Sequence, residues 1–304
     1  MSEFTYKADV LSTNSPHLFK ELSNYQYKNF VKVIVNEDKE IFDKFSSELL
    51  QELCADTSVN IKKLTALDKL YLLLIIRAYN ISPSITFVCE TNEQDKEGKP
   101  IKANINIDIV ELLQRLETIN ISPKFENTNN DVKVYGSLPK QFYYSTDIEA
   151  VSDCVDTVVI NDNHIDLTNF TVQQKVETVN KLPSYVLPDI YRFLTTQEEL
   201  IRQDPFIVIN TEREITTPKE TFISFLNGSM PETVKLFYRV DLRDFYTNEY
   251  TLIKKFKFTY DHIAKITPAE LSLYVDVIRE DQAKEKEEMD KREKESNQDY
   301  LPRV

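Results

Sequence analysis

The segment from Leu64 to Asn80, LTALDKLYLLLIIRAYN, constrains the fold most because it is apolar on almost every side of the helix that it predicts. Thr65 is a capping residue placed just before the first turn. Apolar residues then recur at helical spacing on two adjoining faces, so we expect other elements to bury this helix over much of its circumference. The candidate residues of this core or interaction helix are Leu64, Leu67, Tyr71, Leu74 and Arg77.

Two alternating segments follow this helix directly. Pro83 ends the helix, and SITFVCE and IKANINIDI then alternate between apolar and polar residues, as strands with one covered face do. The connection TNEQDKEGKP contains Gly98 and Pro100, which are turn residues. We therefore predict an antiparallel hairpin.

Helical spacing also marks the residues on either side of this unit. YKNFVKVIVNEDKEIFDKFSSELLQELC predicts two helices with a break near Asn36, and VELLQRLETI predicts a short helix after the hairpin. VKVYGSLPKQFYYS returns to extended structure around Gly136.

From residue 150 the sequence changes character. TVVINDNHIDLTNF is an excursion or a strand pair, and its acidic INDNHID indicates a turn rather than a calcium loop, because it lacks the central glycine and the final glutamate. TVQQKVETVNKLPSYVLPDIYRFLTTQEELI predicts two helices separated by Pro183 and Pro188. FIVINTEREITTP is a further extended segment, and PETVKLFYRVDLRDFY is helical.

These segments together predict an α+β fold that is predominantly helical, with small antiparallel β-hairpins inserted between helices. We divide the chain into three parts. Residues 1–145 hold the N-terminal helices and the hairpin, residues 146–278 form a second, mainly helical part, and residues 279–304 are a charged C-terminal extension.

The carboxyl-terminal helix has clear initiation signals. Thr267 can cap it, Pro268 is tolerated in the first turn, and Glu270 lies beside the positive end of the helix dipole. The candidate docking residues on this helix are Leu271, Tyr274 and Ile278. Beyond Ile278 the apolar stripe ends, so the extension is a solvated helix, a disordered segment, or a helix that orders on a partner.

Charge and composition limit the classes of partner. There are 37 basic and 50 acidic side chains, and the resulting charge of −13 repels phosphate backbones and anionic membranes, so neither nucleic acid nor a membrane is the expected partner. LIKKFKF, from Leu252 to Phe258, is the best local basic patch, and it is read more simply as a half-buried strand or helix edge.

No apolar run is long enough to span a bilayer, and no secretory signal is recognisable at the amino terminus. Three dispersed cysteines suit a reducing compartment.

No motif for catalysis, cofactor binding or metal binding is found. Three glycines in the whole chain are too few for a phosphate-binding loop. His17, His164 and His262 are isolated in sequence, which is typical of surface or capping histidines, and Cys89 is expected to be a small buried side chain. We therefore expect no enzyme activity, cofactor or metal.

Several segments, in the same order along the chain, resemble the T4-like phage baseplate hub protein family. These are LTALDKLYLLLIIRAYNISPSITFVCE followed by KANINIDI, then IDLTNFTVQQKVETVNKLPSYVLPDIYRFL, FISFLNGSMPETVKLFYRVDLRDFY and ITPAELSLYVDVIREDQAKEKEE. The resemblance implies a structural or assembly role in the baseplate hub of a contractile-tailed phage. It also implies other baseplate and tail proteins as partners in a hetero-oligomer, assembled in the host cytoplasm and located in the virion tail.

Two alternatives stay open at this point. A tail-assembly scaffold or chaperone would be absent from the mature virion, and the charged extension is its one indication in the sequence. A carboxylate-dependent hydrolase without short motifs could be assembled by folding from the 50 acidic residues, which is a weak argument because acidic residues are abundant throughout the chain.

Overall fold

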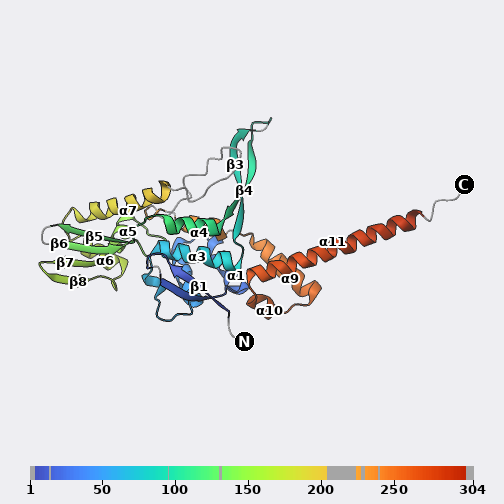
Figure 1. The fold of residues 1–304 in the computed structure, drawn as a ribbon, viewed down its shortest axis with the longest axis horizontal. Coiled ribbons are helices and arrows are strands. Elements are labelled where there is room, and N and C mark those ends of the chain that lie inside the picture. The colour runs from blue at the N-terminus through green and yellow to red at the C-terminus, as the bar shows by residue number, and fades with distance from the viewer. Residues whose placement is uncertain are drawn as a thin grey trace. The chain divides into compact units, whose positions relative to one another are not determined.

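The computed structural model describes residues 4–13, 15–94, 96–129, 132–203, 224–226, 230–238 and 240–298. Its contacts divide the chain into two compact units (Figure 1). The larger unit comprises Met1–Glu21 and Asn29–Val240, and the smaller unit comprises Leu22–Lys28 and Asp241–Val304. Our division at residues 145 and 278 is a different partition and stays a prediction.

The helix α3 (Ala66–Asn80) lies at the centre of the larger unit, as predicted. Its residues from Ala66 to Arg77 are all buried. Thr65 caps the helix through a reciprocal pair of hydrogen bonds, in which the Asp68 amide donates to Thr65 Oγ1 (3.1 Å) and the Thr65 amide donates to Asp68 Oδ2 (3.0 Å). Four elements surround the helix: β1 (Thr5–Val10), α2 (Lys39–Leu53), α4 (Ile109–Thr118) and α8 (Met230–Tyr238).

A small antiparallel hairpin of β1 and β2 (Ser15–Lys20) begins the larger unit. Hydrogen bonds hold the turn between β1 and β2 to α3, because the amide and the hydroxyl of Ser12 both donate to the Asp68 carboxylate (2.8 and 2.9 Å). The predicted helical break near Asn36 is confirmed: α1 (Asn24–Val35) ends before it, and Asp38 caps α2.

The hairpin predicted after α3 is also confirmed. β3 (Ser84–Gln94) pairs antiparallel with β4 (Pro100–Asp108) in a register that places Ile85 opposite Ile107. Gly98 has a φ of +78° in the connection, a conformation that glycine adopts without strain. The predicted helix VELLQRLETI is α4, and a 3-10 turn η1 (Ile61–Lys63) precedes α3.

The helices α2, α3, α4 and α8 form one layer of the larger unit, the helical layer. A four-stranded antiparallel sheet of order β5-β6-β7-β8 forms the other layer. Its strands are β5 (Lys124–Asn129), β6 (Val132–Ser137), β7 (Val155–Ile160) and β8 (Asn163–Asp166). The strand-pair reading of TVVINDNHIDLTNF is therefore correct. Asn161 and Asp162, both at positive φ (48° and 64°), form the two-residue turn, a conformation that Asn and Asp tolerate better than most residues.

Gly136 in β6 permits a close approach between strands. A Cβ atom at this position would lie 2.0 Å from the Cys154 carbonyl oxygen and 2.2 Å from the Phe125 ring. Only glycine therefore fits here without displacing backbone.

Three helices accompany this sheet: α5 (Asp147–Asp153), α6 (Val172–Val179) and α7 (Val186–Gln203). Pro183 separates α6 from α7 as predicted, but Pro188 lies inside the first turn of α7, so the prediction that it separates the helices is wrong. Proline is tolerated there because the first amides of a helix have no intrahelical partner. The extended segment predicted at FIVINTEREITTP lies outside the described residues.

The smaller unit is helical. It contains the first turn of α1, followed by α9 (Leu242–Phe256), α10 (Tyr260–Lys265) and α11 (Pro268–Gln298). Lys28 and Glu249 form a buried ion pair of 2.6 Å, and the Asn24 amide donates to the Ile266 carbonyl (2.7 Å). One core cluster of this unit consists of Leu252, Ile263 and Leu271, with Phe258, Ile266, Val275 and Ile278 packed against it.

The structure is thus an α+β fold that is mainly helical with small antiparallel sheets, as predicted. The carboxyl-terminal helix begins at Pro268, and Thr267 and Glu270 cap it reciprocally (2.9 and 3.2 Å). No helix within the described ranges is both long and apolar enough to cross a membrane.

Candidate functional site

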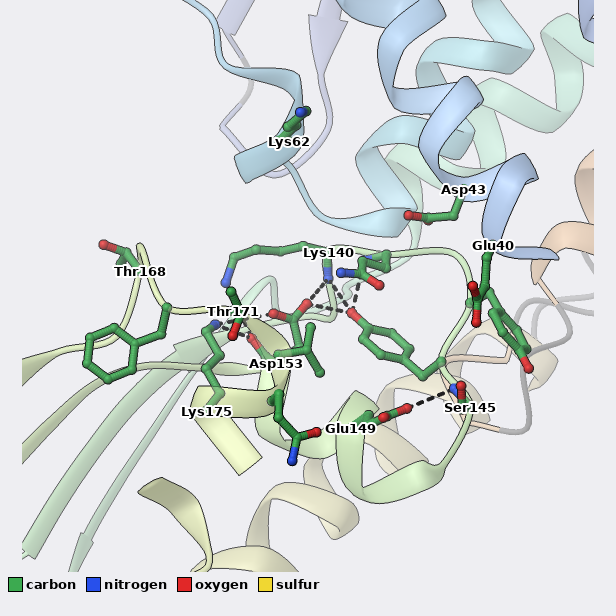
Figure 2. A pocket seen from close by; sticks show the side chains of 16 residues that line it. Glu40, Asp43, Lys62, Lys140, Ser145, Glu149, Asp153, Thr168, Thr171 and Lys175 are labelled. Carbon is green, nitrogen blue, oxygen red and sulfur yellow. Dashed lines mark hydrogen bonds and ion pairs between the residues drawn. The ribbon is translucent and has the colours of Figure 1, made fainter. Parts of the chain in front are cut away.

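A pocket of about 650 Å³ opens in the larger unit between the helical layer and the four-stranded sheet (Figure 2). The connection of residues 138–146, between β6 and α5, runs along its base. The pocket brings together charged and aromatic side chains from segments far apart in the chain. Its principal lining residues are Glu40, Asp43, Lys62, Lys140, Tyr143, Tyr144, Glu149, Asp153, Phe170, Thr171 and Lys175.

Asp153, at the end of α5, is the centre of a buried charged network. Lys175 of α6 lies 3.3 Å from Asp153 Oδ1, and its Nζ also donates to the Asp153 carbonyl (2.8 Å). The Tyr144 hydroxyl and the Lys140 amide (3.0 Å) both donate to Asp153 Oδ2. Both carboxylate oxygens are therefore occupied, and Figure 2 shows these groups converging from three segments.

A second carboxylate extends the network to the sheet. Lys140 Nζ lies 2.5 Å from Asp156 Oδ1, and Lys175 Nζ is 3.9 Å from the same atom. The Ser137 hydroxyl donates to the other Asp156 oxygen (2.9 Å). Two lysines and two aspartates thus alternate in one cluster at the base of the pocket.

The surroundings set the protonation of this cluster. Burial by itself raises the pKa of Asp153, but the ammonium groups of Lys175 and Lys140 outweigh it and hold that pKa below its usual value. Burial lowers the pKa of Lys175 and raises the pKa of Tyr144 well above its ordinary range. A paired carboxylate of lowered pKa is a poor proton acceptor at neutral pH, so the cluster is better suited to holding the connection 138–146 than to moving protons.

The helical layer holds the same connection from the opposite side. Lys69 of α3 donates to the Lys140 carbonyl (2.6 Å) and to Ser47 Oγ (3.0 Å), and the Phe142 amide donates to Asp43 of α2. Burial lowers the pKa of Lys69 and raises the pKa of Asp43. The base of the pocket is therefore a polar joint between the two layers.

His17 is not isolated in the folded chain. Its Nε2 lies 3.1 Å from Ser15 Oγ, and its Nδ1 lies 3.0 Å from Asp56 Oδ2. Hydrogen bonds from Ser58, supplemented by His17, lower the pKa of Asp56 to about 2. The order serine, histidine, aspartate is that of a hydrolytic triad. The sequence offered no signal for it, because Asp56 is 39 positions from His17.

The residues that we selected on α3 lie in the core of the larger unit. Leu67, Tyr71, Leu74 and Arg77 are buried, and Leu64 is partly buried. Arg77 Nε donates to the Phe237 carbonyl (2.5 Å), and its Nη1 donates to the Ser82 carbonyl, so the guanidinium satisfies backbone groups at the ends of two helices. In this structure these residues hold the fold together, and a role of theirs in binding a partner stays a prediction.

The residues that we selected on α11 divide into two groups. Leu271 is buried and Ile278 packs against the same core cluster, whereas Tyr274 is 41% exposed and contacts the Phe258 ring at 5.2 Å. Leu273 and Val277, which the sequence analysis did not select, are 66% and 56% exposed. Their spacing of four residues places them on one face of the helix.

One comparison with known proteins identifies a family. The family model described as T4 bacteriophage base plate protein matches residues 1–227 of the 304-residue chain. No curated protein and no solved structure matches the chain. The match covers α3 with β1, α2 and α4 around it, the four-stranded sheet and the pocket, and it ends before α8. This chain belongs to the T4 bacteriophage base plate protein family.

Proposed function

We propose that this phage baseplate protein is a structural component of the baseplate hub that acts by binding other tail proteins. The observation that carries the proposal is the family match over residues 1–227. The exposed apolar residues Leu273 and Val277 on α11 add support, because large apolar side chains that are grouped on one surface are typical of protein interfaces. In this proposal the protein works in a hetero-oligomer assembled in the host cytoplasm, and neither nucleic acid nor a membrane is its partner.

Mass spectrometry of purified virions and of baseplate assembly intermediates tests this proposal. A hub component is expected in both at a fixed ratio to other baseplate subunits. A scaffold or chaperone, which is the alternative, would occur in the intermediates and be absent from virions. If the protein were absent from both, the hub proposal would be wrong.

We also propose that the protein acts without turning over a substrate. The strongest counter-candidate is the Ser15, His17 and Asp56 arrangement. Ser15 begins strand β2 in a two-stranded ladder, opposite Val10. Acyl transfer also requires backbone amides aimed at the developing oxyanion, as at a sharp strand-to-helix turn, and a regular ladder does not supply that geometry.

We therefore expect a fluorophosphonate probe, which labels activated serines, to leave Ser15 unmodified in the intact protein. Hydrolysis of 4-nitrophenyl acetate is likewise expected to be equal for the native protein and for Ser15→Ala. Stoichiometric labelling of Ser15 that disappears in His17→Ala would contradict this prediction and establish a serine hydrolase. A serine esterase treated in parallel verifies that the probe is active.

A further inference from the structure

The last turn of α9 and the capping residue that follows it, residues 253–257, expose both lysine and apolar side chains. Lys254, Lys255 and Lys257 are exposed, and Ile253 and Phe256 are each 38% exposed. Leu252, the residue before this turn, is fully buried in the core of the smaller unit. The predicted half-buried edge is therefore limited to Leu252 and the partly buried Phe258.

The structure of the helix end explains part of this arrangement. Lysines at a helix carboxyl terminus interact favourably with the helix dipole, and Lys257 occupies the left-handed position (φ 62°) that closes the helix. This account covers the charges but not the apolar residues. Exposed apolar residues continue back along α9 as Tyr250 (63%) and Tyr246 (50%). Tyr246, Tyr250 and Ile253 are spaced by four and three residues, so they form one stripe.

Among the residues that the structure describes, none forms an ion pair with Lys254, Lys255 or Lys257. Three cations of α11, by contrast, pair with carboxylates of their own helix: Arg279, Lys284 and Arg292. In a chain of net charge −13, three unpaired lysines in one turn are a local exception that complements an acidic surface.

We propose that this surface, the stripe of Tyr246, Tyr250 and Ile253 with Lys254 and Lys257 beside it, docks an acidic amphipathic segment of another baseplate protein. Carboxylates of the partner pair with the two lysines, and its apolar residues cover the stripe. From Tyr246 to Lys257 the stripe is about 17 Å long, which about three turns of a partner helix would match. The inference rests on the proposed baseplate role and names the chemistry of one partner.

A nucleic acid fits this surface less well. A phosphate backbone would engage the lysines and leave the stripe of Tyr246, Tyr250 and Ile253 uncovered. It would also bring many phosphates close to a protein of strongly negative charge. A short acidic segment carries few charges and supplies apolar contacts as well.

The test compares two charge-matched variants in the phage that carries this chain. Lys254→Glu with Lys257→Glu reverses the charge of the proposed surface, and Lys286→Glu with Lys291→Glu makes the same change on exposed residues of α11. We expect the first variant to be incorporated into baseplates about tenfold less than the native protein, as the loss of about 1.4 kcal/mol of binding would cause. The α11 variant is expected to be incorporated normally. Circular dichroism and thermal melting of both purified variants verify folding.

A zero-length carbodiimide cross-linker identifies the contact directly. It joins a lysine to a carboxylate only where the two are in contact, so isolated baseplates should yield Lys254 or Lys257 linked to an Asp or Glu of a different tail protein. Normal incorporation of the Lys254 and Lys257 variant, with no such cross-link, would overturn the inference and leave the baseplate role intact. Absence of the native protein from baseplates and intermediates would instead reject the baseplate role. A gel shift with DNA that the same variant abolishes would assign the surface to nucleic acid and overturn the inference.

Discussion

Replacing Asp153 with alanine is expected to destabilise the larger unit by about 3–5 kcal/mol, because it removes the nearer of the two carboxylates that pair with the buried ammonium of Lys175. The change also removes the acceptor of the Tyr144 hydroxyl and of the Lys140 amide. The Tyr144 hydroxyl and the Lys140 amide belong to the connection 138–146, so the loss should extend to the joint between the helical layer and the sheet. Urea denaturation followed by circular dichroism measures the free energy of unfolding.

An exposed ion pair provides the control for this experiment. Glu48 of α2 lies 4.0 Å from Lys44 at the surface, and Glu48→Ala is expected to change stability by less than about 0.5 kcal/mol. Replacing both members of the buried pair, Asp153→Ala with Lys175→Met, should recover much of the loss because no buried charge is then left unpaired. Equal stability of Asp153→Ala and the native protein would show that the network does not hold the joint.

The same carboxylate predicts how stability depends on pH. The folded pKa of Asp153 lies below its unfolded value, so its contribution is complete above the unfolded pKa and is lost as pH falls through the folded pKa. The native protein should therefore lose stability below about pH 4, and Asp153→Asn should lose less over the same interval. Denaturation midpoints across acidic pH compare the two slopes.

Replacing Phe30 with alanine is the second change for which we expect a large loss, about 3–5 kcal/mol of the larger unit's stability. Phe30 is fully buried in α1, and its ring contacts Phe42 and Phe45 of α2 (5.9 and 6.2 Å) and Tyr238 of α8 (4.9 Å). Truncation opens a cavity between the consecutive helices α1 and α2 and the sequence-distant helix α8. The urea midpoint should fall with little change in the denaturant slope.

Tyr191 on α7 supplies the comparison for Phe30. It is an aromatic residue of similar size that is 45% exposed, so Tyr191→Ala should cost much less than Phe30→Ala. A small effect of Phe30→Ala would mean that α1 does not take part in the core of the larger unit.

Elements with local signals could be predicted from the sequence. The capping Thr65, the apolar run after it, and Pro83 lie within twenty positions, and they specify the start, burial and end of α3. The β3–β4 hairpin followed in the same way from alternation and turn residues, whereas the sequence left β7–β8 as either an excursion or a strand pair and gave no prediction of β1–β2. Pro188 was misread because a proline that ends one helix and a proline in the first turn of the next have the same local sequence context.

The charged cluster could not be predicted, because only the tertiary fold assembles it. Lys69, Lys140 and Lys175 come from three separated segments, and no fixed spacing links them to Asp153.

The choice of docking residues on α11 from the sequence met a related difficulty. The most regular apolar stripe, which contains Leu271 and Ile278, is the one that the smaller unit uses for its own core. Residues outside that stripe, such as Leu273, are the ones available to a partner.

The length of α11 has a geometric consequence for anything attached to its far end. The helix has 31 residues, and its contacts with the core cluster end at Ile278, so about 30 Å of rod extends past the last packed turn. In an α-helix each residue adds an angular step of about 100° as well as an advance of about 1.5 Å. Removing seven residues would draw the tip back by about 10 Å and nearly preserve its azimuth, whereas removing two would turn the tip to almost the opposite side.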